Sequence, residues 1–262
     1  MSERKGLANR CQCCSIALKL WLRAPLCSAD PPPPCPYCAH ALDPIGYHCL
    51  TCKSHGTLIR RHDNFRDILF KFCEQGRLLP KKEPLIPTKQ RDSSGVVRDT
   101  NTRGDIQLQS TGSRPRAIDC AITSPLQPHY LNGAAKETGF AAEAYAREVK
   151  EARYGVGFAS QGLDFTPMVV ETFGAVCQKG KDLLNFVANS VAKCRSMSVS
   201  KVIQRINSQL SCCLMRYNAH AVLERLLPPP CFVIVPITGC IILRCYIYIY
   251  IYVYVFTYIW RL

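Results

Sequence analysis

The stretch CPYCAHALDPIGYHCLTC, residues 35–52, decides how the first part of this chain folds. In the spacing C-x2-C-x9-H-x3-C it offers four candidate metal ligands: Cys35, Cys38, His48 and Cys52. Zinc favours four thiolate or imidazole ligands in a tetrahedron, and two closely spaced pairs on short turns supply them. The intervening Asp43-Pro44-Ile45-Gly46 predicts the turn that brings the pairs together. We therefore predict a zinc knuckle over residues 35–55, in which the metal replaces the hydrophobic core that so short a segment lacks.

The ligand set has alternatives within the same segment. Cys49 and His55 stand close enough in the sequence to replace a member of either pair. A loop of ordinary reduced cysteines is the other interpretation, although two closely spaced pairs at this distance favour metal binding.

The cysteine content and the net charge limit the classes of protein to which this chain can belong. The 262 residues include 17 cysteines, irregularly placed and with doublets such as Cys13-Cys14, and residues 1–10 are polar and basic. Neither an evenly spaced disulfide framework nor a secretory signal is indicated, so we expect a reducing compartment. The formal net charge of +14 favours a polyanionic partner, with nucleic acid before an anionic membrane.

Beyond the knuckle, hydrophobic periodicity predicts a mixed α/β domain. Five segments have helical character: residues 11–27, 62–76, 134–153, 180–194 and 199–227. Three segments have strand character: residues 105–109, 117–123 and 164–173. In the helix over 62–76 we expect Asp63 as the N-terminal cap, Gly76 as the end and one apolar face. Residues 80–104 lack periodicity and are predicted to be a loop.

These elements predict a chain of five parts. They are an N-terminal helix with a proline-rich spacer, the zinc knuckle, a core of a few strands flanked by helices, a helical extension and an apolar tail. The boundaries that we predict for them are residues 1–34, 35–55, 56–179, 180–227 and 228–262.

Two aspartates at strand-like segments carry the candidate chemistry. Asp105 and Asp119 are separated by thirteen residues, and carboxylates on neighbouring strands can hold Mg²⁺. Such an ion would polarise a phosphodiester oxygen and activate a water molecule for in-line attack. We expect Lys150 to orient that water, with Lys136 as the alternative, and Glu83 to add a further carboxylate. By spacing alone, residues of these types are equally typical of turns and helix surfaces.

The order of these motifs resembles one family of proteins. The run CPYC…DPIGYHCLTC…RRHDNFRDILFKFC is similar to the zinc knuckle and following helix of non-LTR retrotransposon proteins that encode a restriction-enzyme-like endonuclease downstream of their reverse transcriptase. In that family an Arg-His-Asn-like motif follows the knuckle, here Arg61-His62-Asp63. A basic residue, Pro and Asp come next, here Arg103-Gly104-Asp105. A second acidic residue, here Asp119, completes the layout shared with the PD-(D/E)xK nucleases. The resemblance covers about residues 15–225 and implies a restriction-endonuclease-like core.

Departures from the family pattern predict a truncated and decayed copy. Gly104 stands where the family has Pro, and Asp119-Cys120-Ala121 lacks the lysine often found two residues after the second acid. The chain also contains no reverse transcriptase motif. A lysine that has moved to Lys150, as the superfamily permits, would compensate for the missing one. We therefore expect the nuclease fold to be retained more readily than nuclease activity.

The expected partner is DNA, with RNA as the alternative, and no small-molecule cofactor is implied. The candidate phosphate contacts are Arg60, Arg61, His62 and Arg103. Contacts of this kind position nucleic acid without reading its bases. The resemblance implies a nuclear or cytoplasmic location. A catalytically dead, zinc-dependent nucleic-acid-binding module is the alternative function.

The apolar tail supports a third interpretation. Residues 245–260 read CYIYIYIYVYVFTYIW, a tract that alternating T and A in DNA would encode. Arg244 separates two apolar stretches, each shorter than the roughly 18–20 residues that span a bilayer as a helix. Joined across Arg244, residues 231–260 predict a single-pass membrane anchor, opposed by the central arginine and by Pro236. Otherwise the segment is an aggregation-prone tail.

Overall fold

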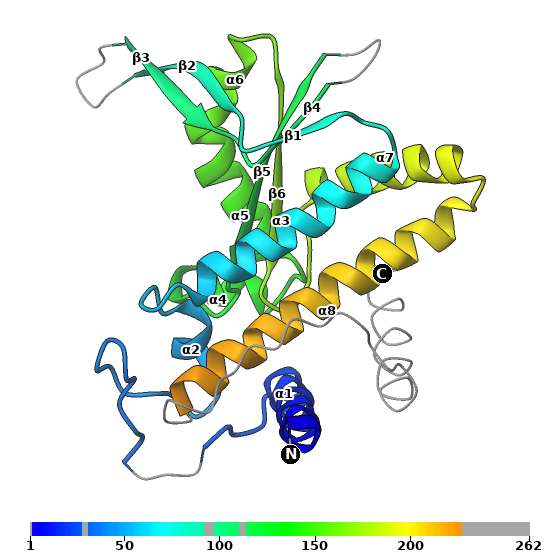
Figure 1. The fold of residues 1–262 in the computed structure, drawn as a ribbon. Helices are drawn as coiled ribbons and strands as arrows, with labels where there is room; N and C mark the ends of the chain where they lie inside the picture. Colours follow the sequence, from blue (N-terminus) through cyan, green and yellow to red (C-terminus); the bar gives the residue numbers. More distant parts are fainter. Residues whose placement is uncertain (1, 28–30, 92–96, 110–113, 227–262) are drawn as a thin grey trace.

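In the computed structural model, a four-stranded sheet lies at the centre of the molecule with helices around it (Figure 1). The described residues are 2–27, 31–91, 97–109 and 114–226. The strand order is β1-β4-β5-β6, with bounds Pro80–Lys82, Ile106–Leu108, Arg116–Thr123 and Asp164–Glu171. β1, β4 and β5 pair antiparallel, whereas β5 and β6 pair parallel. The mixed α/β class predicted from the sequence is confirmed.

Helices cover both faces of the sheet. A parallel pair needs a crossover, which here consists of four short helical segments: α4 Pro128–Ala134, α5 Phe140–Tyr145, η1 Ala146–Gly155 and α6 Val156–Ala159. The opposite face is covered by three longer helices: α3 Thr57–Gln75, α7 Gln178–Arg195 and α8 Val199–Leu226. Because both faces are covered, β5 buries side chains on both: Ala117, Ile118, Cys120 and Ala121.

Helix α3 follows the predicted amphipathic pattern but begins earlier. Its apolar face is buried in the core through three side chains: Phe65, Leu69 and Phe72. The helix starts at Thr57 after Gly56, whose φ of 66° suits a glycine, so the predicted cap at Asp63 is wrong. It ends at Gly76, as predicted.

Residues predicted as a loop instead form a two-stranded ribbon. β2 Leu85–Arg91 pairs antiparallel with β3 Val97–Arg103. The ribbon projects from the body of the molecule (Figure 1), and a hydrogen bond from Gly104 N to Pro84 O, 3.1 Å long, closes its base. The loop prediction is wrong because the two strands are mainly polar, so they contain no alternation of apolar residues to detect.

The crossover also differs from the single helix predicted over 134–153. α4 ends at Ala134, and α5 starts after Gly139, whose φ of 86° is a left-handed conformation that interrupts the helix. From Ala146 the backbone continues as the π-helix η1, in which hydrogen bonds join residues five apart. A helical pattern in the sequence does not distinguish an α-helix from this variant.

The remaining predicted elements agree in type with the structure. Strands β4, β5 and β6 and helices α7 and α8 lie where strand and helix patterns were expected: 105–109, 117–123, 164–173, 180–194 and 199–227. α7 and α8 bury side chains in the same hydrophobic core as α3 and the sheet.

The knuckle and the N-terminal helix form a second, smaller cluster. α1 spans Ser2–Leu22, earlier than the predicted 11–27, and α2 spans Tyr47–Thr51 inside the knuckle. The buried side chains of this cluster come from α1, the knuckle and α8, and include Leu20, Leu42, Leu50 and Val222. The knuckle is therefore docked against the C-terminal part of α8.

The apolar tail predicted over 228–262, with its candidate membrane segment 231–260, lies outside the described residues. Among the helices that the structure describes, none is both long and apolar enough to cross a membrane.

Candidate metal centre and carboxylate cluster

Four side chains of the knuckle converge on one point, as their spacing predicts. The ligand atoms of Cys35, Cys38, His48 and Cys52 all lie within 4.8 Å of one another. Cys38 Sγ is 3.2 Å from His48 Nε2 and 3.7 Å from Cys52 Sγ. Three thiolates and one imidazole in this arrangement match the donor set of a structural zinc site. The predicted ligands therefore form a group that could hold a metal ion.

Two turns of the backbone place these ligands. In the first turn, Cys35 N donates to His40 O at 2.7 Å. In the second, the Asp43 carboxylate accepts from the backbone N–H groups of Tyr47 and His48 at 2.8 and 2.6 Å, and so caps α2. The turn that was predicted to join the two ligand pairs thus also starts the helix that carries His48.

The two alternative ligands have other surroundings. Cys49 is 1% exposed, and burial raises the pKa of its thiol to about 12. His55 Nδ1 lies 3.2 Å from a carboxylate oxygen of Glu224, and the His55 ring stacks on Tyr37. Neither residue belongs to the group of converging ligand atoms.

A buried arginine of α8 lies beside the metal centre. The Arg225 guanidinium donates to the carbonyl oxygens of Cys52 and Ser54 at 3.4 and 3.0 Å, and also hydrogen-bonds the Cys52 side chain. Burial alone would raise the pKa of the Cys52 thiol, but hydrogen bonds from Arg225, the Ser54 backbone and Cys38 lower it to about 6. The lowered pKa favours the thiolate form of Cys52, which is the form that binds zinc.

The predicted carboxylates lie in a second cluster, beside β5. Asp105, directly before β4, accepts a hydrogen bond from Cys120 N at 2.6 Å through Oδ2. The same oxygen lies 3.2 Å from His62 Nε2 of α3, which is also 3.1 Å from Cys120 O. His62 thus bridges a carboxylate oxygen and a backbone carbonyl oxygen that face one point.

Asp119 and Lys150 form the second ion pair of this cluster. Lys150 Nζ contacts Asp119 Oδ2, and the two side chains are 14% and 15% exposed. Lys150 belongs to the π-helix η1, and the rings of Tyr145 and Tyr154 lie 5.9 and 5.6 Å from its ammonium. Both rings therefore lie beside the Lys150 ammonium. π-Helical turns are rare and occur frequently at functional sites.

Charges couple the two ion pairs. The hydrogen bond to Asp105 raises the pKa of His62 to about 9, although burial opposes it. Burial would lower the pKa of Lys150, but the charge and hydrogen bond of Asp119 raise it. Burial raises the pKa of the Asp119 carboxyl, and the Lys150 ammonium opposes this rise. Lys150 and His62 are therefore the two cations of the cluster.

Two other predicted residues lie away from the Asp119–Lys150 pair. The Glu83 carboxylate pairs through Oε1 with Arg66 Nη1, and its Oε2 lies 3.7 Å from Arg103 Nη1. The Glu83 backbone N–H donates to Asp105 O at 2.9 Å, so the residue adjoins the cluster through its main chain. Lys136 is exposed in the segment between α4 and α5. Of the two predicted lysines, the structure brings Lys150 to the carboxylates.

The predicted phosphate contacts have different environments. Arg61 is 4% exposed and donates to Asn218 Oδ1 at 2.7 Å and to a knuckle carbonyl oxygen at 3.3 Å. Burial removes Arg61 from the side chains able to reach phosphate, and its role is to join the knuckle to α8. Arg60 forms an ion pair with Glu224 at 2.5 Å and is 39% exposed, whereas Arg103 is 65% exposed. Arg103 and part of Arg60 remain accessible to a ligand.

Sequence reasoning missed three buried polar residues of α8. These residues are Asn218, Glu224 and Arg225, and each is at most 7% exposed. Asn218 and Arg225 are seven residues apart, so they lie on one face of the helix, among the apolar residues that face the core. Polar residues at this spacing inside an apolar stripe are the signal that could have identified them.

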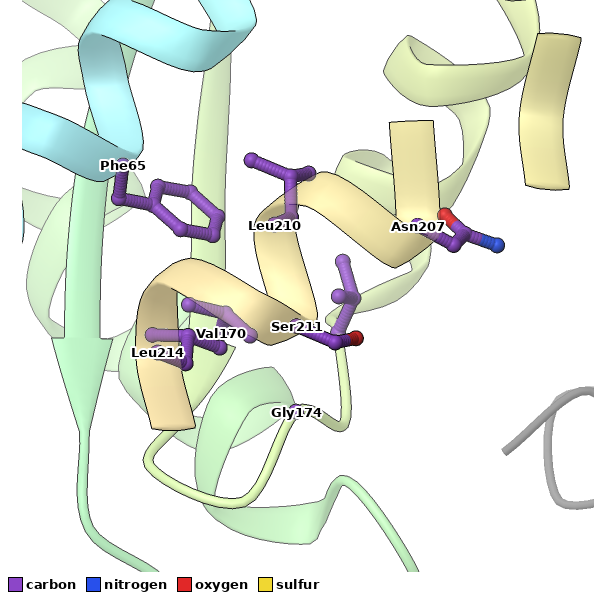
Figure 2. A pocket seen from close by; sticks show the side chains of 8 residues that line it. Phe65, Val170, Gly174, Asn207, Leu210, Ser211 and Leu214 are labelled. Carbon is purple, nitrogen blue, oxygen red and sulfur yellow. The ribbon is translucent and has the colours of Figure 1, made fainter. Parts of the chain in front are cut away.

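The pocket in Figure 2 lies away from both sites. Its walls come from α3, β6, the segment after β6 and α8, and include Phe65, Val170 and Leu214 of the core. Asn207 and Ser211 are the polar side chains of the described lining. A gap with so few polar groups offers little to fix a ligand, and we assign it to imperfect packing between α8 and the sheet.

Comparison with protein-family models and with curated proteins finds no match for this chain. The resemblance to retrotransposon endonucleases therefore stays a prediction.

Proposed function

We propose that this protein is a metal-dependent DNA endonuclease-like protein of retrotransposon origin, in which a zinc knuckle anchors a carboxylate centre. The observation that carries the proposal is that Asp105, Asp119 and Lys150, from separate elements, lie around one segment of β5. Paired carboxylates beside a lysine are the side chains that metal-dependent phosphodiester hydrolysis uses.

The oxygen atoms of this centre suit a hard cation such as Mg²⁺. Asp105 Oδ2 and Cys120 O share one donor, His62 Nε2, so these two oxygens already converge. We propose that the carboxylates of Asp105 and Asp119 hold the ion, which when bound would polarise a phosphodiester oxygen and lower the pKa of a water molecule.

Lys150 and His62 supply positive charge around that centre. Because Asp119 raises the pKa of Lys150, the ammonium persists at neutral pH and would donate to the phosphate oxygen on which charge develops. The hydrogen bond to Asp105 raises the pKa of His62 to about 9, which favours its protonated form, and the side chain is 30% exposed. Its exposed part could therefore contact a phosphodiester oxygen.

Charge and exposure support nucleic acid as the substrate. The net charge is +14, and the exposed Arg103 immediately precedes Asp105 at the base of the β2–β3 ribbon. A phosphate held by Arg103 would lie next to the carboxylates. The resemblance favours DNA over RNA and a nuclear or cytoplasmic location.

Nicking of supercoiled plasmid by the full chain tests the proposal. We expect nicking that requires Mg²⁺ or Mn²⁺ and that falls by about 10²-fold or more in Asp105→Asn and Asp119→Asn. Asp164→Asn is the matched control, because Asp164 is an exposed aspartate at the start of the neighbouring strand β6. Nicking that survives in both site variants, or that needs no divalent ion, would contradict the proposal.

A binding module without catalysis is the second candidate. Two observations favour it: both carboxylates are already paired with internal cations, and Ala121 stands where a lysine commonly follows the second acid. For this function we expect no nicking, together with a DNA gel shift that zinc chelation abolishes. A gel shift that persists after chelation would exclude a zinc-dependent module.

A further inference from the structure

The metal centre would carry a net negative charge when it holds zinc. Three thiolates and one neutral imidazole around Zn²⁺ leave one negative charge on the complex. Cys35 and Cys52 are 2% and 7% exposed, so much of this charge is held away from water. A buried net charge is costly unless an opposite charge lies beside it.

Arg225 lies where that opposite charge is needed. It is 4% exposed, and besides Cys52 and Ser54 its guanidinium donates to Ala221 O at 2.9 Å and lies 5.5 Å from the Tyr37 ring centroid. In the described structure its acceptors, apart from the Cys52 side chain, are neutral carbonyl oxygens. The buried cation therefore gains as much from an anionic metal centre as the metal centre gains from the cation.

The residue before Arg225 extends this link to α3. Glu224 accepts hydrogen bonds from Thr57 Oγ1 at 2.6 Å and from Arg60 Nη2 at 2.5 Å, both in the first turn of α3. His62, which contacts Asp105, follows about one turn later on the same helix. Successive residues of α8 thus join the metal centre to the helix that reaches the carboxylate cluster.

We propose that Arg225 is a positioning residue of the metal centre: its guanidinium compensates the negative charge of the zinc-loaded ligand set, and metal binding in turn holds the end of α8 against the knuckle. The inference rests on zinc occupancy of the proposed site. A purely structural role, in which Arg225 only packs and donates to carbonyl groups, would not depend on the charge of the ligands.

Metal affinity of the full chain tests this inference, with Co²⁺ as a coloured substitute for zinc. We expect Arg225→Gln to weaken Co²⁺ binding, and Zn²⁺ binding in competition, by about 10–100-fold without changing the tetrahedral Co²⁺ spectrum. Arg225→Lys keeps the charge and should lose less. Arg216→Gln is the matched control, because Arg216 is an exposed arginine of the same helix, and it should bind as the wild type does.

A change of ligand charge separates electrostatics from packing. Cys38→His gives two thiolates and two imidazoles, whose zinc complex is neutral. In that background Arg225→Gln should weaken Co²⁺ binding far less than in the wild type. Equal losses in the two backgrounds, or no loss in either, would overturn the inference and leave the metal centre intact. A wild-type chain that binds no Co²⁺ would overturn the metal centre and the inference together.

Loss of the fold is distinguished from loss of charge by Arg225→Lys. If Arg225→Gln prevents folding, as judged by circular dichroism with excess zinc, the comparison is made with Arg225→Lys in the wild-type and Cys38→His backgrounds. Because lysine keeps the positive charge, Arg225→Lys should retain most of the Co²⁺ affinity in both backgrounds, and a loss of about 10–100-fold with lysine in the wild-type background would contradict the proposed charge compensation.

Discussion

The metal centre and the carboxylate cluster differ in how their charges are matched. The metal centre collects its ligands from residues 35–52, and their sulfur and imidazole atoms face one another with the Arg225 guanidinium beside Cys52. The carboxylate cluster collects groups from α3, the segment before β4, β5 and η1, and each carboxylate has its own cation. The first site could therefore hold a metal ion as the cation that its ligands share. The second is balanced until a metal or a substrate displaces His62 or Lys150.

Removal of the metal should give the largest effect, because the ligands of the metal centre share it. Chelation would remove the ion that joins the four ligands and leave the knuckle without a core, so we expect the melting temperature to fall by about 10 °C or more. Differential scanning fluorimetry with and without chelator measures this, and added zinc should restore the original value. An unchanged melting temperature would mean that the stability of the knuckle does not depend on a bound metal ion.

The second largest effect is expected at Asn218, a buried residue of α8. Asn218 is fully buried, accepts from Arg61 and donates to Thr172 O at 2.7 Å. Asn218→Leu leaves a buried guanidinium without its side-chain acceptor, so we expect a loss of about 2–4 kcal/mol in the free energy of unfolding by urea. Asn189→Leu, at an exposed position of α7, is the control and should change it by less than about 0.5 kcal/mol. Similar losses of unfolding free energy in the two variants would show that the buried hydrogen bonds of Asn218 do not stabilise the fold.

Within the carboxylate cluster, Lys150 should matter for chemistry more than for folding. Lys150→Met removes the ammonium beside Asp119, and we expect nicking to slow by about 10²-fold. Lys136→Met is the matched control, because Lys136 is exposed and lies on the same crossover. Equal nicking activity of the two variants would show that Lys150 does not act in catalysis.

The pH dependence of stability should report the His62–Asp105 pair. The pKa of His62 rises from 6.5 to about 9 on folding, so its stabilising contribution is fully present below pH 6.5 and is lost as the pH rises through about 9. The difference in unfolding free energy between wild type and His62→Gln should therefore shrink over this window. A difference that stays constant from pH 6 to pH 10 would show that the pair contributes no such stabilisation.

The smallest effect is expected at the base of the ribbon. Gly104→Pro removes the N–H that donates to Pro84 O, and we expect a loss of about 1 kcal/mol in the free energy of unfolding. Gly104→Ala keeps the N–H, and its Cβ would lie 3.6 Å from Ile86 Cδ1, an ordinary contact. A proline variant as stable as the alanine variant would exclude a role for this hydrogen bond.

The same contrast explains what the sequence could and could not predict. The knuckle was predictable because Cys35, Cys38, His48 and Cys52 lie within one short segment, where chain connectivity alone limits their separation. Asp105, Asp119 and Lys150 are brought together by strand pairing and a crossover, which spacing does not encode. They were singled out from strand-like segments and, more specifically, through a family resemblance, and their catalytic role stays a prediction.

Other features escaped prediction because tertiary contacts decide them. Arg61 looks like a surface cation in the sequence, yet the acceptors supplied by Asn218 and the knuckle allow its burial. The β2–β3 ribbon is polar, so its pairing leaves no hydrophobic pattern. The π-helical turns of η1 share the helical sequence pattern of an α-helix, so the pattern does not reveal them.

The most direct test of the account is to measure the two metals together in the full chain. We predict one zinc that survives dialysis, and Mn²⁺ that binds in addition and is detected by electron paramagnetic resonance. Asp105→Asn should abolish Mn²⁺ binding and leave the zinc content unchanged. Mn²⁺ binding that persists in Asp105→Asn, or zinc that is lost with it, would contradict the assignment of two separate centres with different chemistry.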